Sequence, residues 1–267
     1  MRHTTTISLV IGAAFWAASS VLAASVDAVP LDAAVVVMGE AHDNPTHHLN
    51  QAAWIERMQP AAVVFEMLPA ELGPVATKGA GDAADVLGSA LRWEERGWPD
   101  FAIYAPVFDA AAGAMIVGGE APRETVAAAA NGGAWAAFGA EDSFGLSADL
   151  PAPELEARAA LQDAAHCGLL PQEMLPGMVE AQRLRDAWLA QAVLDALSET
   201  GGPVAVITGN GHARTDWGVP ALLAAARPEL PVISVGQFAE PDGAAPYDHI
   251  VVSPDTDTDG DPCAALR

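Results

Sequence analysis

The sequence predicts an α/β fold, with a largely parallel or mixed central sheet flanked by helices in a single main domain. Six short, nearly all-apolar runs rich in β-branched residues are typical of strands buried on both faces. Longer segments with helical patterns separate these runs, which is the alternation expected of βαβ units. At 267 residues with 51% hydrophobic residues, the chain is long enough to bury one large core.

The predicted strands and helices follow one another along the chain. Strands are expected at residues 34–38, 61–65, 114–117, 204–208, 232–235 and 250–252. Helices are expected at residues 45–58, 82–96, 104–112, 123–138, 153–165, 171–197 and 220–226. Pro176 and Gly177 both disfavour a helix interior, so they are expected to break the long helix. Residues 132–152 have weak periodicity and are expected to form a loop or lid.

The N-terminal residues 1–24 have the pattern of a secretory signal peptide. A basic start precedes an apolar run from Ile7 to about Ala18, and the small-residue pattern Val21-Leu22-Ala23 follows. The run is too short for a permanent membrane span, and no cysteine near the cleavage pattern indicates a lipid anchor. We therefore expect an exported, periplasmic protein whose main domain covers residues 25–253, without direct membrane insertion of the mature chain.

The two cysteines and the acidic composition narrow the possible roles. Cys167 and Cys263 can pair in an oxidising compartment, and we expect a disulfide that ties down an acidic tail at residues 254–267. Two free buried thiols are the alternative. The formal net charge is -23 with only 12 Lys and Arg residues. This balance argues against binding to nucleic acid or to an anionic membrane, since both require clustered basic residues.

Polar residues follow four of the predicted strands. These strand ends read Gly39-Glu40-Ala41-His42, Phe65-Glu66, Gly118-Gly119-Glu120 and Gly209-Asn210-Gly211-His212. The ligand crevice of an open α/β sheet lies beyond the carboxyl ends of its strands, so we expect these residues to meet there. Carboxylates and imidazoles can bind a divalent metal, provide a general base or contact a larger cofactor. Either histidine alone could be an ordinary hydrogen-bonded loop residue, but ionisable groups gathered in a cleft indicate a site.

Two further histidines, His47 and His48, fall in the first turn of a predicted helix. Asn44 can cap this helix, with Pro45 at its first position. Adjacent residues on a helix cannot face the same way. At most one of the two is therefore expected to reach the crevice, and the other to lie on the surface.

Several segments together resemble the ChaN-like haem-binding proteins, which form a wider group with Tiki proteases, TraB-like proteins and erythromycin esterases. The segments, in chain order, are GEAHDNPTHHLNQ, VVFEMLP, GWPDFAIYAP, HCGLLP, EAQRLRDAWLA and ITGNGHARTDWGVP. The resemblance implies an α/β fold, export, haem binding and a part in haem or iron uptake. It places Glu40, His42, Glu66 and His212 in the shared pocket, with Arg214 and Asp216 just after it. Glu120 departs from the asparagine usual in the family and would add a negative charge.

The resemblance leaves the haem ligand open. Tyr104 follows an aromatic stretch containing Trp93, Trp98 and Phe101, and either His47 or His48 could ligate from the neighbouring helix. Tyr104 could equally be an ordinary helix-start residue. A homodimer that holds haem between two copies is also possible.

The same wider group supports a hydrolase as the alternative to a haem-binding protein. A divalent metal held by Glu40, His42 and His212 could activate water, with Glu66 as the acid or base. No Gly-x-Ser-x-Gly sequence occurs, so the serine nucleophile of common α/β-hydrolases is not expected.

Overall fold

The computed structural model of the chain describes residues 24–139, 142–240, 246–253 and 263. The signal peptide predicted at residues 1–24 lies outside these residues apart from Ala24, and the predicted acidic tail does so apart from Cys263. Among the helices described, none is long and apolar enough to cross a membrane.

Six parallel strands form the central sheet, in the spatial order β3-β2-β4-β1-β5-β6. Their bounds are β1 Val35–Glu40, β2 Ala62–Phe65, β3 Met115–Gly118, β4 Val204–Gly209, β5 Val232–Phe238 and β6 His249–Val252. The predicted α/β class is confirmed, and all six strands lie at the predicted places. The parallel arrangement puts the carboxyl ends of β1, β2, β3 and β4 at the same edge of the sheet.

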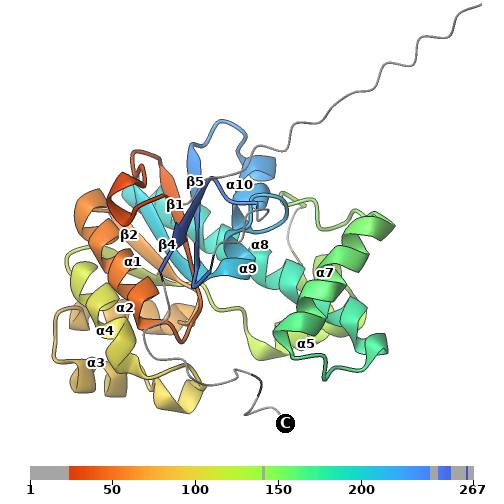
Figure 1. Cartoon of the computed structure of the whole chain (residues 1–267), viewed down its shortest axis with the longest axis horizontal. Helices are drawn as coiled ribbons and strands as arrows, with labels where there is room; N and C mark the ends of the chain where they lie inside the picture. Colours follow the sequence, from red (N-terminus) through yellow and green to blue (C-terminus); the bar gives the residue numbers. More distant parts are fainter. Residues whose placement is uncertain (1–23, 140–141, 241–245, 254–262, 264–267) are drawn as a thin grey trace, which may run out of the picture.

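Helices cover both faces of the sheet, because strand residues alternate between two cores. Val36 and Met38 of β1 point into one core, which α1 (Pro45–Met58) and α4 (Phe101–Ala110) cover. Val35 and Val37 point into the other, which α8 (Leu175–Thr200) covers with α10 (Val219–Ala226). Figure 1 shows α1 to α4 on one side of the sheet and α5 and α7 beside α8, away from the sheet.

The remaining helices are short or lie at the margin of the domain. They are α2 Gly73–Gly79, α3 Ala84–Ala90, α5 Arg123–Gly132, α6 Ala134–Phe138, α7 Ala152–Ala165 and α9 Asn210–Ala213, with 3-10 turns at Val26–Ala28, Ala70–Leu72, Glu94–Arg96 and Gln172–Met174.

Several predicted boundaries were wrong, for identifiable reasons. The long helix is unbroken because it begins at Leu175, which puts Pro176 in the first turn, where a missing N–H costs nothing. Gly133, with φ 93°, separates α5 from α6, so one predicted helix is two and the predicted loop contains a helix. The helix predicted at residues 82–96 ends at Ala90, since Arg92 adopts φ 51°. Asp100 starts α4 early by accepting from the Ala102 amide.

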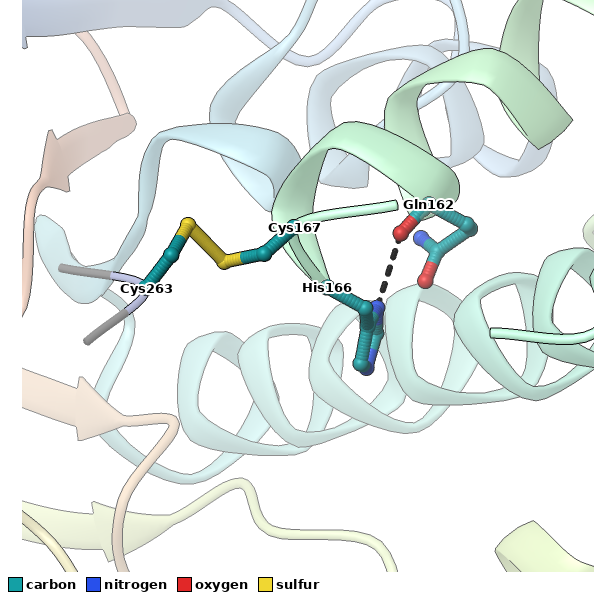
Figure 2. Close-up of a disulfide and its surroundings, with 4 residues drawn as sticks. All are labelled: Gln162, His166, Cys167 and Cys263. Carbon is teal, nitrogen blue, oxygen red and sulfur yellow. Dashed lines mark hydrogen bonds between the residues drawn. A yellow bond between two sulfur atoms is a disulfide. The ribbon is translucent and has the colours of Figure 1, made fainter. Parts of the chain in front are cut away.

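Cys167 and Cys263 form a disulfide, as predicted, with their Cα atoms 5.7 Å apart (Figure 2). Cys167 directly follows the C-terminal cap of α7. The bridge therefore attaches Cys263 to the end of this helix.

Candidate functional site

A cavity of about 850 Å³ opens at the carboxyl end of the sheet. One wall consists of the strand ends and the residues that follow them. The other wall comes from α5, α7 and α8. The cavity therefore lies where the polar strand ends were expected to meet, and its volume is that of a site for a small molecule or cofactor.

Glu40 anchors the first half of the strand-end wall. It is buried at the end of β1, where its Oε1 accepts a hydrogen bond from the Tyr104 hydroxyl at 2.7 Å and its Oε2 accepts one from Gln51 Nε2 at 2.7 Å. His42 Nδ1 lies 2.8 Å from Oε1. Burial opposes ionisation, but the hydrogen bonds from His42 and His48 prevail and lower the pKa of Glu40 to about 2.

Glu66 anchors the second half, directly after β2. Its Oε2 accepts hydrogen bonds from Thr208 Oγ1 at 2.7 Å and from the Gly209 amide at 2.8 Å. Its Oε1 lies 3.3 Å from His212 Nε2 and 4.0 Å from His42 Nε2. The charge of His212 holds the pKa of Glu66 well below its usual range, against the effect of burial.

Each imidazole lies between two carboxylates, and this arrangement favours the protonated ring. His212 Nδ1 is 2.7 Å from Asp186 Oδ1, on the side opposite Glu66. Burial lowers its pKa, but the charges of Glu66 and Asp186 prevail and raise it to about 10. For His42, the Glu40 hydrogen bond and the Glu66 charge likewise outweigh burial and raise the pKa to about 9. Near neutral pH the protonated rings of His42 and His212 can therefore donate hydrogen bonds, but neither ring has a free nitrogen lone pair.

Gly209 allows this arrangement. A Cβ atom at this position would lie 2.9 Å from His42 Nε2, so a larger residue would displace the ring. The glycine therefore makes room for a side chain of the site itself.

Basic and aromatic side chains from α5, α7, α8 and the segment after α9 form an arginine and aromatic wall of the cavity. Four of the 12 basic residues of the chain line the cavity, namely Arg123, Arg158, Arg185 and Arg214. The guanidinium groups of Arg158 and Arg214 lie 5.0 and 4.0 Å from the ring centre of Trp217. Arg185 makes no ion pair or hydrogen bond with another residue that the structure describes. Arg158 and Arg214 also form ion pairs with Glu154 and Asp216, and the wall as a whole suits an anionic ligand with an apolar body.

The sequence profile of the family described as haem-binding uptake, Tiki superfamily, ChaN matches residues 30–223. The chain belongs to this family. The match covers all the strand ends that form the site.

Solved structures add a comparison of the fold. The structure described as cofacial heme binding to ChaN of Campylobacter jejuni is 20% identical, with a TM-score of 0.63 over 82% of this chain and 87% of that chain. A type III effector, HopBA1, is 14% identical over 83% and 88% of the two chains (TM-score 0.42). A succinoglycan biosynthesis protein is 11% identical over 82% and 72% (TM-score 0.39). No curated protein sequence gives a significant match. This ChaN-family chain therefore shares the fold of the Campylobacter protein.

The structure brings six of the ten predicted site residues to the cavity. These are Glu40, His42, Glu66, Glu120, His212 and Arg214. Glu120 forms an ion pair with Arg96, so the negative charge it adds to this ChaN-family pocket is balanced. Asp216 lies outside the cavity lining and accepts from Arg214 Nε at 3.0 Å.

His47, His48 and Tyr104 lie beneath the strand-end wall and do not line the cavity. The expectation that one histidine would lie on the surface was wrong, because each faces a different polar partner inside the domain. His47 Nδ1 accepts from the Ala41 amide at 3.0 Å, while His48 Nε2 donates to the His42 carbonyl at 3.0 Å. All three are fully buried.

The metal alternative has no support in the part of the chain that the structure describes. No group of three His, Cys, Asp or Glu residues there is placed to hold a metal ion. Glu40, His42 and His212 do not converge on a common point, because Glu66 lies between the two imidazoles and pairs with both.

Sequence reasoning missed two residues of α8 that contact His212. Asp186 Oδ1 and Gln182 Nε2 reach His212 Nδ1 at 2.7 and 3.1 Å. They are four residues apart, on one face of the helix. A charged residue among the apolar positions of EAQRLRDAWLA was the available signal, since buried acids need a partner. His166, in HCGLLP, also lines the cavity.

Proposed function

We propose that this chain is an exported haem-binding protein that takes part in haem or iron uptake, and that the cavity at the sheet edge is the haem site. Membership of the ChaN family supports haem as the ligand. The description of the Campylobacter structure, which names haem binding, supports the same conclusion.

The observation that carries the proposal is the arginine and aromatic wall. Haem has a large apolar ring and two propionates, so it needs an apolar surface together with cationic or amide groups. Trp98, Trp217 and Phe238 offer ring surfaces around the cavity, and the arginines offer the cations. A third of the basic residues of the chain line this one cavity. Bound haem would supply an iron centre that these residues enclose.

Export to the periplasm is supported by the N-terminal sequence and by the disulfide. The basic start and short apolar run are typical of secretory signals. A bridge between Cys167 and Cys263 is favoured in an oxidising compartment.

The proposal is tested by titrating the purified mature protein with ferric hemin and following the Soret absorbance. We expect saturable binding near one haem per chain. A ratio of one haem per two chains, with a dimer by size-exclusion chromatography, would indicate a site shared between two copies. Absence of saturable binding would refute the proposal.

A matched pair of variants tests the arginine wall. Arg185→Gln should weaken hemin binding by about 10-fold to 100-fold, because a charge-assisted hydrogen bond contributes about 1.5–3 kcal/mol. Arg92→Gln is the control, since Arg92 is exposed, lies outside the cavity and pairs with Glu95. Equal affinities of the two variants would show that Arg185 does not hold a propionate.

A further inference from the structure

The helix α7 turns one continuous face to the cavity. Its cavity-lining residues have the spacing i, i+3, i+4, i+7 and i+8 of a single helical face, and they are Arg158, Leu161, Gln162, Ala165 and His166. No residue of α7 itself is buried, and Leu161 is 44% exposed. A helix normally buries its apolar stripe against another element. This face is therefore open to a ligand in the cavity.

His166 ends this face with a ring nitrogen prepared for coordination. Its Nδ1 lies 2.8 Å from the main-chain carbonyl oxygen of Gln162 (Figure 2). A carbonyl oxygen only accepts, so Nδ1 carries a proton, and the tautomer with this bond has its lone pair on Nε2. Nε2 has no hydrogen-bond partner among the described residues. Iron-binding and zinc-binding histidines are commonly oriented by such a bond from the other nitrogen.

The other candidate ligands around the cavity are already engaged. His42 and His212 have carboxylates beside both ring nitrogens, and these carboxylates keep the rings protonated near neutral pH. The Tyr247 hydroxyl donates to the Asn210 carbonyl at 2.9 Å. Tyr104 is buried beneath the wall.

We propose that Nε2 of His166 is an axial ligand of the haem iron, with α7 lying against one face of the porphyrin. This inference rests on the proposed haem-binding function. It assigns the ligand to the helical wall, whereas the sequence had suggested Tyr104, His47 or His48.

The disulfide lies directly beside His166 in the sequence. Cys167 follows it directly, and Figure 2 shows the ring projecting from the helix end beside the bridge to Cys263.

The test is a hemin titration of the full mature chain with its disulfide formed, for wild type and for His166→Ala. Absorbance and electron paramagnetic resonance spectra are recorded for both proteins. We expect the variant to lose the imidazole-ligated ferric signature and to bind hemin more than about tenfold more weakly. Free imidazole should restore the signature by entering the vacated space. His249→Ala, at a histidine outside the cavity, and Tyr247→Phe should keep the wild-type spectrum.

The outcomes separate the ligand from the function. An unchanged spectrum in His166→Ala, with wild-type protein that binds hemin, would overturn the ligand assignment and leave the proposed function standing. Loss of the signature in Tyr247→Phe instead would also overturn it. No hemin binding by wild type would overturn both. His166→Gln keeps a polar side chain at this position. Its circular dichroism spectrum and melting temperature check that a loss of iron coordination is not caused by unfolding.

Discussion

Tyr104 is a residue for which structural and ligand roles give different measurable results. Its ring is fully buried and its hydroxyl donates to the ionised Glu40 at 2.7 Å. Tyr104→Phe should therefore lower the free energy of unfolding by about 1.5–3 kcal/mol, because a hydrogen bond to a charged group is lost. The hemin spectrum should not change. Urea denaturation and a hemin titration of the same variant measure the two effects.

The matched control for this substitution is the other tyrosine of the chain. The Tyr247 hydroxyl donates to a main-chain carbonyl, so Tyr247→Phe should cost only about 0.5–1.5 kcal/mol. If Tyr104→Phe instead abolished the haem signature at unchanged stability, Tyr104 would be the ligand and not a support for Glu40.

Some site residues could be predicted because their position in the sequence places them at a strand end, and others could not. Glu40, His42, Glu66 and His212 follow buried parallel strands, so topology alone places them together at one edge. No strand-end pattern identifies His166 in the sequence. It lies at a helix end, and only the arrangement of α7 over the sheet edge brings it to the cavity.

At the scale of elements, Gly177 sets the distance between α5 and α8, two helices of the cavity wall. A Cβ atom at this position would lie 2.6 Å from the Ala130 carbonyl oxygen of α5. Gly177→Ala improves helix propensity by about 1 kcal/mol, but separating the helices should cost more. We expect net destabilisation of about 1–2 kcal/mol and weaker hemin binding, measured by urea denaturation and titration.

Gly132→Ala provides the comparison, because a Cβ atom there would meet no atom within 4 Å. This variant should be neutral or slightly stabilising. Equal stabilities for the two variants would mean that the contact between α5 and α8 adjusts without cost.

The helices show why element boundaries were harder to predict than strands. The strand runs at residues 34–38 and 204–208 are apolar apart from Thr208, and their bounds lie within two residues of the observed β1 and β4. Pro176 and Gly177 have the composition of a helix break, yet Pro176 falls in a first turn and Gly177 fits a close helix contact. Both explanations depend on tertiary neighbours, which one sequence does not display.

For the whole molecule, the buried acid and histidine groups predict a stability maximum in mildly acidic solution. The folded-state pKa values of His42 and His212, about 9 and about 10, exceed the ordinary 6.5. Above about pH 6.5 the folded state therefore holds protons that the unfolded chain has released, so stability falls as pH rises through 9 to 10. The lowered pKa of Glu40 acts oppositely, and its contribution is lost as pH falls from 4.5 towards 2.

The net charge of -23 could produce a similar loss of stability at alkaline pH, because repulsion between carboxylates also destabilises the compact state. Salt distinguishes the two causes, since it screens exposed charges far more than buried ones. Urea unfolding from about pH 5 to 9 at high ionic strength should therefore retain the alkaline loss in wild type. Glu66→Gln removes the charge that both imidazoles face. In this variant the free energy of unfolding should fall less steeply with pH, and the pKa values of His42 and His212, followed by NMR, should be lower than in wild type. A wild-type slope that disappears in high salt would assign the loss to the surface charge instead.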